Sequence, residues 1–273
     1  MKLAVSNIAW AKQEETAAAE QLNSLGVKYV EVAPTKNWDD PLQASDDEIK
    51  KYLELWKSNN LEVVAFQSML FNRPDLKIFE SDTTRLETLD YLKGFIKLAK
   101  QMGATAMVFG SPKNRQRGSM NEKKAFDIAK DFFGELGRTA RENGVYFCIE
   151  PNPVEYACDF VTTAQQGIEL VEAVDQEGFG LHLDIAGMTL AKDDIARSIT
   201  AASPFLRHFH ISAPYLEAVD SQAEVDYKTA INALGSTGYS GYVSIEMKPG
   251  EDNLARTEAA VRFAQGLLAS AEK

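Results

Sequence analysis

The 273-residue sequence predicts a single (β/α)8 TIM barrel domain that extends from residue 1 to residue 273. Short apolar runs alternate with longer segments of helical periodicity, and eight such pairs follow one another along the chain. Alternation of this kind requires a parallel sheet, and eight units are typical of a closed barrel of about 250 residues. An open doubly wound sheet is the alternative, but no glycine-rich dinucleotide motif follows the first apolar run.

The first half of the chain contains four strand and helix units. Each predicted strand is short and rich in Val, Ala or Phe, and each predicted helix has apolar residues at helical spacing. Ser45 and Glu48 form a capping-box pattern where the second helix begins. The predicted strands are 2–7, 27–34, 61–68 and 104–112, and the predicted helices are 14–26, 45–60, 84–103 and 121–143.

The second half repeats this pattern and contains the candidate metal-binding and catalytic residues. In the fifth strand, Pro151 and Pro153 cannot continue a central ladder of hydrogen bonds, so the strand ends near Glu150. No Pro/Gly/Ser-rich linker is long enough to divide the chain into domains. The predicted strands are 145–150, 179–187, 206–212 and 241–249, and the predicted helices are 162–175, 191–203, 224–238 and 252–273.

Composition narrows the class of protein. Hydrophobic residues make up 45% and charged residues 25% of the chain, as in soluble globular proteins. A net charge of −11 argues against a nucleic-acid surface, although a pocket can still be locally basic. Cys148 lies in an apolar strand, which favours a buried free thiol over a disulfide with Cys158. No signal-peptide pattern or membrane-length apolar run occurs, so we expect a cytoplasmic protein without a membrane partner.

Four metal-capable side chains end the last four predicted strands. They are Glu150, Asp184, His210 and Glu246. Because active sites of such barrels lie at the carboxyl ends of the strands, we expect these side chains to converge. One acidic residue at a strand end is more often a loop cap, but four in succession predict a metal site. Three carboxylates and one imidazole suit one divalent ion, with Mn²⁺ preferred and Mg²⁺, Co²⁺ or Zn²⁺ as alternatives.

Other polar residues are candidates for substrate contacts because of their positions at strand ends or near a ligand. Asn152 and Lys248 each lie two positions after a candidate ligand. His182 and His208 each lie two positions before one, and for both of these histidines a supporting role is favoured. The loop GSPKNRQRG carries Arg115, which could bind a phosphate or carboxylate or simply be solvated. Glu31, Trp10, Phe66 and Phe71 could also line the pocket. The expected substrate contacts are Asn7, Gln67, Arg115, Asn152, His182 and Lys248.

Four segments carry a family resemblance that covers essentially the whole chain in element order. The segments CIEPNP, LHLDIAG, HFHIS and YVSIEMKP resemble motifs of the xylose-isomerase-like barrels, the sugar phosphate isomerase/epimerase group that includes ketose 3-epimerases and hydroxypyruvate isomerases. In the ketose 3-epimerase branch, the residues that match the four candidate ligands hold one divalent ion. The resemblance also implies that Glu150 and Glu246 move a proton next to a carbonyl, as two carboxylates beside a metal can do.

The sequence departs from that branch at two positions. The branch has a histidine three residues after the metal-binding aspartate and an arginine six residues after the metal-binding histidine; here Gly187 and Leu216 stand there. Those side chains hold substrate hydroxyls in the epimerases. We therefore expect a carbohydrate-like substrate other than a free ketohexose, with an anionic group as one alternative.

The resemblance and the residues together predict a metal-dependent isomerase or epimerase of a sugar, sugar acid or sugar phosphate. The reaction would pass through an enediolate, with Glu150 and Glu246 as the acid and base. The alternative is a metal-dependent dehydratase of a keto-cyclitol or dehydroshikimate-like substrate, because the first proton abstraction is shared. A nuclease with a histidine-rich zinc cluster is disfavoured by three histidines in all. A non-catalytic barrel is disfavoured by the intact ligand set, and a homo-oligomer stays open.

Overall fold

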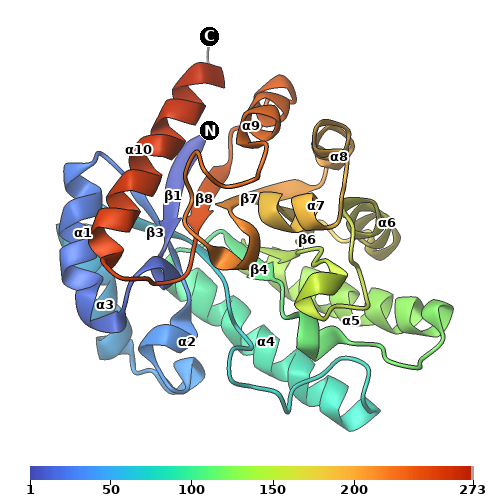
Figure 1. Cartoon of the computed structure of the whole chain (residues 1–273). Helices are drawn as coiled ribbons and strands as arrows, with labels where there is room; N and C mark the ends of the chain where they lie inside the picture. Colours follow the sequence, from blue (N-terminus) through green and yellow to red (C-terminus); the bar gives the residue numbers. More distant parts are fainter. Residues whose placement is uncertain (272–273) are drawn as a thin grey trace.

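Eight parallel strands close into a barrel in the computed structural model, which describes residues 1–271 (Figure 1). The order β1 to β8 follows the sequence, and β1 pairs with both β2 and β8, so the described sheet has no free edge. The predicted fold class is therefore confirmed. The last two residues of the predicted domain, 272 and 273, lie outside the described residues.

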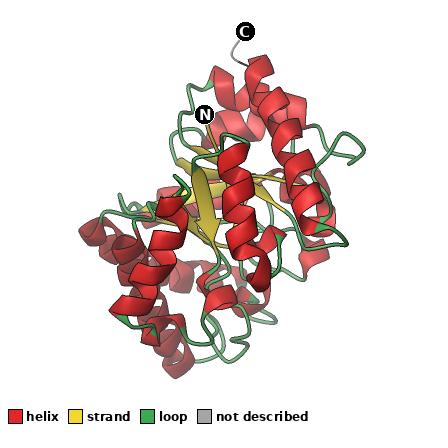
Figure 2. Cartoon of the chain, turned by 90° about the vertical axis from the view of Figure 1, so that its left-hand side faces the viewer, coloured by secondary structure: helices red, strands yellow, loops and turns green. Residues whose placement is uncertain are grey.

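Helices surround the strands on the outside of the barrel (Figure 2). The strands are β1 Lys2–Ser6, β2 Tyr29–Val32, β3 Glu62–Phe66, β4 Ala106–Phe109, β5 Tyr146–Ile149, β6 Phe179–Asp184, β7 Leu206–Ser212 and β8 Tyr242–Glu246. The α-helices are α1 Glu15–Ser24, α2 Pro34–Asn37, α3 Asp46–Ser58, α4 Asp82–Met102, α5 Glu122–Asn143, α6 Ala164–Val174, α7 Ile185–Leu190, α8 Ile195–Ala202, α9 Tyr227–Ser236 and α10 Asn253–Ala271. None of these helices is both long and apolar enough to cross a membrane.

Two short helices, α2 and α7, were not predicted. α7 begins directly after Asp184 because the Asp184 side chain accepts a hydrogen bond from the backbone N–H of Gly187 and caps the helix. The predicted strand 179–187 therefore stops at Asp184. α2 begins with Pro34, whose fixed φ suits the first helical position. Both short helices occupy the side of the barrel where the strands end.

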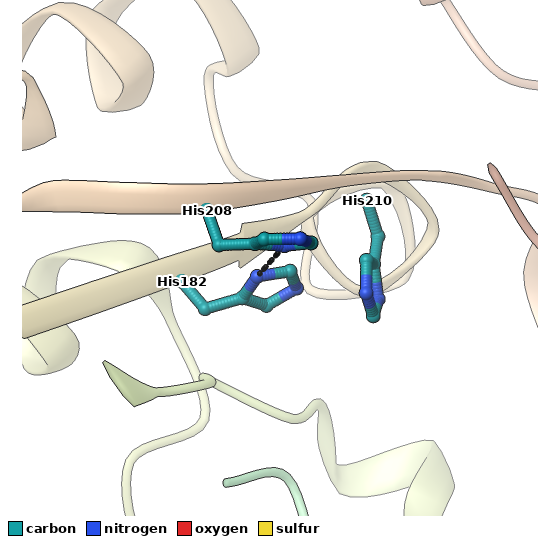
Figure 3. A group of neighbouring side chains, drawn as sticks. All are labelled: His182, His208 and His210. Atoms are coloured by element: carbon teal, nitrogen blue, oxygen red, sulfur yellow. Dashed lines mark hydrogen bonds between the residues drawn. The ribbon is translucent and has the colours of Figure 1, made fainter. Parts of the chain in front are cut away.

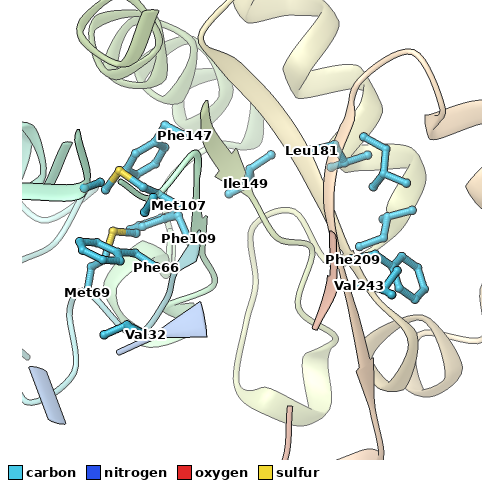
Figure 4. Close-up of a cluster of buried hydrophobic side chains, with 14 of the residues drawn as sticks. Val32, Phe66, Met69, Met107, Phe109, Phe147, Ile149, Leu181, Phe209 and Val243 are labelled. Carbon is cyan, nitrogen blue, oxygen red and sulfur yellow. The ribbon is translucent and has the colours of Figure 1, made fainter. Parts of the chain in front are cut away.

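Because successive side chains of a strand point to opposite faces, large apolar side chains lie on one face of the sheet and small or polar ones on the other. Phe66, Phe109, Phe147 and Phe209 belong to the large core between strands and helices (Figure 4). Cys148 alternates with Phe147 and Ile149, so it shares a face with Glu150 and belongs to a small separate cluster with alanines. Both cysteines are buried and free, as expected.

Helix α5 approaches the start of β6 closely at Gly137. A Cβ atom at this position would lie 2.8 Å from Cβ of Gln176 and 2.9 Å from Cβ of Phe179. One turn earlier, the Phe133 ring stacks on Phe179 with centroids 5.0 Å apart. A Cβ atom at Gly134 of the same helix would meet no neighbouring atom within 4 Å. The absence of a side chain is therefore required for close packing at Gly137 but not at Gly134.

We expect Gly137→Ala to lower the free energy of unfolding by about 1–3 kcal/mol, because the added methyl group overpacks the contact with β6. Gly134→Ala is the matched control on the same helix and should raise it by about 0.5–1 kcal/mol through helix propensity. Urea unfolding followed by circular dichroism measures both changes. Shifts of equal sign in the two variants would contradict this account of α5.

Candidate active site

The structure brings the four predicted metal ligands together at the carboxyl ends of β5 to β8. Asp184 and His210 are direct partners in the register of β6 and β7. Candidate ligand atoms of Glu150, Asp184 and His210 all lie within 4.8 Å of one another. Glu246 completes the group, since its Oε2 lies 3.3 Å from Nδ1 of His210.

Glu31 at the end of β2 orients the His210 ring from across the barrel. Its two carboxylate oxygens lie 2.9 and 3.1 Å from Nε2 of His210, and both side chains are buried. The carboxylate accepts the N–H of Nε2, so Nδ1 can bind an ion through its lone pair when it gives up its own proton. Nδ1 is buried without a hydrogen-bond partner among the described residues and faces the carboxylates. A buried nitrogen in this state fits a metal ligand.

Asp184 is held by two hydrogen bonds besides its place in the strand. Oδ1 caps α7, and Oδ2 accepts the hydroxyl of Ser212. Ser212 Oγ in turn accepts the backbone N–H of Ala186 at 3.2 Å. The carboxylate is therefore rigidly placed by β6, β7 and the first turn of α7 before any ion binds.

The electrostatics of the group also fit a cation. Burial, Asp184 and Glu246 raise the pKa of Glu150 to about 8, and burial and Glu246 raise the pKa of Asp184 to about 6. Burial acts to lower the pKa of His210, but Glu31 and Glu246 outweigh it and raise that pKa well above its usual value. Crowded buried carboxylates are stabilised by a positive charge, so a divalent ion would replace protons here.

His210 belongs to a cluster of three histidines from β6 and β7 (Figure 3). Nδ1 of His208 is 3.2 Å from Nδ1 of His182, and the His182 and His210 rings meet edge to face at 4.1 Å. The three offer ring nitrogens within 4.8 Å of one another, so they too could hold an ion. However, burial lowers the pKa of His208 to about 4 and that of His182 well below its usual value. We interpret His182 and His208 as neutral side chains that support His210, because burial disfavours their protonated forms and both rings pack against the His210 ring.

A cavity of about 730 Å³ opens above the ligands. Glu150, Asp184 and Glu246 line it together with residues from the loops after β3, β4, β5 and β7. Of the predicted substrate contacts, Gln67 and Asn152 line this cavity. Phe71, expected as part of an apolar wall, also lines it, whereas Trp10 and Phe66 are buried in the core.

Three other predicted substrate contacts lie elsewhere. Asn7 is fully buried and joins β1 to β2, because its Oδ1 accepts the backbone N–H of Ala33 at 2.8 Å. His182 is fully buried beneath the ligands. Lys248 is half-exposed and pairs with Glu217 outside the cavity. His182 lies in β6 as predicted, whereas Asn7 and Lys248 lie beyond the ends of β1 and β8. All three side chains are engaged by protein groups rather than facing the cavity.

Arg115 corrects the prediction of an anion-binding loop. Its guanidinium is fully buried and donates to the backbone carbonyl oxygens of two neighbouring loops. Sequence could not show this, because a basic loop looks the same whether its arginine faces solvent or carbonyls. Lys113 is the one basic side chain of this loop that lines the cavity. The acceptors of Arg115 are the carbonyls of Phe109, Gly110, Glu150, Phe160 and Val161.

The sequence did not predict that Glu31 and Ser212 contact candidate ligands. Glu31 was expected at the pocket wall, but it binds His210, and Ser212 was not singled out at all. A lone carboxylate inside the apolar strand YVEV was the available signal for Glu31. Tyr156, Tyr215 and Leu216 line the cavity from loops whose register no periodic pattern predicts.

Comparison with known proteins shows the family and the fold. A family model described as xylose isomerase-like TIM barrel matches residues 19–266. A probable ketose 3-epimerase of Synechocystis sp. (strain ATCC 27184 / PCC 6803 / Kazusa) is 27% identical over 261 residues, 92% of this chain and 86% of that protein. Among solved structures, an L-ribulose 3-epimerase has a TM-score of 0.83 at 18% identity, covering 100% of this chain and 96% of that one. The IOLI protein with a bound zinc atom has a TM-score of 0.80 at 18% identity, covering 99% of each chain. These two structures show the likeness of fold.

We expect Arg115→Ala to lower the free energy of unfolding by at least about 3 kcal/mol, because several buried carbonyls lose their donor at about 1–3 kcal/mol each. Lys113→Ala in the same turn is the control and should change it by no more than about 0.5 kcal/mol. Chemical unfolding measures both. An Arg115→Ala protein of normal stability would restore the interpretation of Arg115 as a substrate contact.

We expect Glu31→Gln to weaken Mn²⁺ binding by about 10–100-fold, because the amide no longer holds the N–H on Nε2 of His210 with a negative charge. Titration calorimetry on metal-stripped protein, with about one ion bound per chain, measures the change. Glu62→Gln, an exposed carboxylate at the opposite end of the neighbouring strand, is the control. Equal affinity in the Glu31→Gln and unmodified proteins would remove Glu31 from the site.

Proposed function

The chain belongs to the xylose isomerase-like TIM barrel family, and we propose that it is a divalent-metal-dependent isomerase or epimerase of a carbohydrate-like substrate. The convergence of three carboxylates and Nδ1 of His210 beneath one cavity carries this proposal. The relative named as a probable ketose 3-epimerase, which aligns over 92% of the chain, supports a sugar as the substrate.

Glu150, Asp184, His210 and Glu246 would hold the ion. When bound, it would act as a Lewis acid that polarises the substrate carbonyl and acidifies the neighbouring C–H. A set of three carboxylates and one imidazole favours Mn²⁺, with Mg²⁺ and Co²⁺ as alternatives. The zinc atom in the IOLI protein supports Zn²⁺ as a further alternative.

Glu150 and Glu246 are the proposed acid and base. They end β5 and β8, which are separated by two strands, and both line the cavity. One carboxylate takes the proton from the carbon beside the carbonyl, and the C–H electron pair delocalises onto the carbonyl oxygen. In an epimerase, the other carboxyl group returns a proton to the opposite face of the same carbon. In an isomerase, a proton returns to the adjacent carbon.

Gly110 provides the room that Glu150 needs. A Cβ atom at this position would collide with Oε2 of Glu150 and would lie 3.4 Å from Oδ1 of Asn152. The absence of a side chain there keeps the Glu150 carboxylate free to face the cavity. Asn152 beside it offers an amide that can bind a substrate hydroxyl.

The cavity wall supports a substrate different from a free ketohexose. The backbone N–H of Gly187 is engaged in capping by Asp184, and Leu216 contributes an apolar side chain to the cavity. Among basic residues, Lys113 and Arg73 line the cavity, but Arg73 is paired with Asp75 at 2.7 Å. Lys113 is thus the group that an anionic substituent would meet.

We expect Glu150→Gln and Glu246→Gln each to lower kcat by about 10²–10⁴-fold, because the amide cannot accept the proton. Proton–deuterium exchange in D₂O, screened over ketoses, sugar acids and sugar phosphates, first identifies the substrate without assuming a product. Glu217→Gln, an exposed carboxylate outside the cavity, is the control.

An epimerase should reveal itself by asymmetry between the two variants. One variant would still exchange the proton of one epimer with solvent while failing to interconvert the pair. Formation of a UV-absorbing enone would instead identify a dehydratase. Near-normal turnover in both variants would refute the two-glutamate mechanism.

A further inference from the structure

Two exposed aromatic side chains lie in the cavity wall and have no part in the proposed chemistry. Phe71 is 62% exposed and Tyr215 is 57% exposed, although aromatic side chains of this size are usually buried. Phe71 follows β3 and Tyr215 follows β7. Strands β3 and β7 stand four apart in a ring of eight, so their loops approach the cavity from opposite sides. The two rings therefore belong to opposing walls of one cavity.

The backbone around both rings is strained in the same way. Tyr215 and Leu216 have φ of +59°, and in the other loop Ser68 and Asn72 have φ of +54° and +60°. Residues with a Cβ rarely adopt this region, and such strain persists where the surroundings hold it and often marks a ligand site. All four residues line the cavity.

Specific contacts hold Tyr215 in place without burying its ring. Its backbone N–H donates to the hydroxyl of Tyr156 at 2.9 Å, and the two rings meet edge to face at 5.8 Å. The backbone N–H of Lys248 donates to the carbonyl of Leu216 at 2.8 Å and fixes the next residue. The loop thus presents an ordered aromatic face to the cavity, which is pre-organised for stacking.

The size of the cavity favours a substrate larger than one sugar. Its volume of about 730 Å³ lies in the upper part of the roughly 300–1,000 Å³ that drug-sized ligands fill. Glu150, Asp184, Glu246 and Asn152 line the cavity, and Leu70, Phe71 and Leu216 add apolar side chains to its wall. Arg73 is already paired with Asp75, which leaves Lys113 as the basic side chain of the cavity wall that a phosphate would meet.

We propose that Phe71 and Tyr215 form a second subsite that holds a ring attached to the reacting sugar, so that the substrate is a glycoside whose reacting sugar carries a ketone in its ring. This inference rests on the proposed function, because it places the reacting sugar at the metal ligands. The attached ring, whether a second sugar or an aryl group, stacks its apolar face on the aromatic side chains. The subsite selects the substrate, and the chemistry stays with Glu150 and Glu246.

The test compares matched glycosides by titration calorimetry on the Mn²⁺-loaded protein. Methyl and phenyl β-glycosides of D-glucose and of D-galactose lack the ketone and serve as unreactive analogues, and within each pair they differ only in the attached group. We expect at least one phenyl glycoside to bind about tenfold or more tightly than its methyl counterpart, as aromatic stacking plus apolar burial predicts. Phe71→Ala and Tyr215→Ala should each reduce this ratio to about threefold or less. Neither variant should change affinity for the methyl glycoside or for Mn²⁺.

Two further variants sharpen the result. Tyr215→Phe keeps the ring and should keep the ratio, and Leu86→Ala removes an equally exposed apolar side chain that does not line the cavity. Equal affinities for methyl and phenyl glycosides in the unmodified protein, including no measurable binding by any, would overturn the proposal. So would a ratio that survives in both alanine variants, or tighter binding of glucose 6-phosphate that Lys113→Ala abolishes. Because these ratios need no turnover, a failure here is distinct from loss of metal binding or proton exchange.

Discussion

The contact between Glu31 and His210 is the interaction on which the site depends. It joins β2 to β7 through the inside of the barrel, at 2.9 Å and away from solvent. Burial acts against the charge on Glu31, but His210 outweighs it and lowers the pKa of Glu31 to about 2. The carboxylate therefore stays ionised and holds the imidazole in one orientation. All other ligands are arranged around the nitrogen that this contact leaves free.

Repulsion among the three crowded carboxylates destabilises the folded protein. Apolar packing on the outer face of the strands offsets this destabilisation. The pKa of about 8 for Glu150 reports the mutual repulsion and desolvation. Outside the barrel, Phe133 packs on Phe147 and Phe179, and such aromatic contacts continue beneath α5. Alternation along the strands of a closed barrel thus places apolar side chains on one face, where their burial stabilises the fold, and the crowded polar side chains on the other.

The parts that sequence predicted are those that depend on strand alternation and strand ends. Asp184, His210 and Glu246 could be placed because each ends a short apolar run, and parallel strands bring such ends together. Arg115 and Lys248 could not, because a loop can turn a side chain toward carbonyls or a neighbouring carboxylate with no periodic trace in the sequence. The short helix α7 was missed for a related reason. A residue that ends a strand can also cap a helix, as Asp184 does.

The difference between strand ends and loops also bears on substrate selectivity. The candidate ligands sit on strand ends fixed by the barrel, so their geometry tolerates little variation. Tyr215, Leu216 and Phe71 instead sit on loops, where backbone strain is held by a few local contacts such as the hydroxyl of Tyr156. Loop residues can change without disturbing the ligands, because no described hydrogen bond links Tyr215 to the four ligand side chains. Related barrels can therefore keep the same side chains at their strand ends while their loops differ.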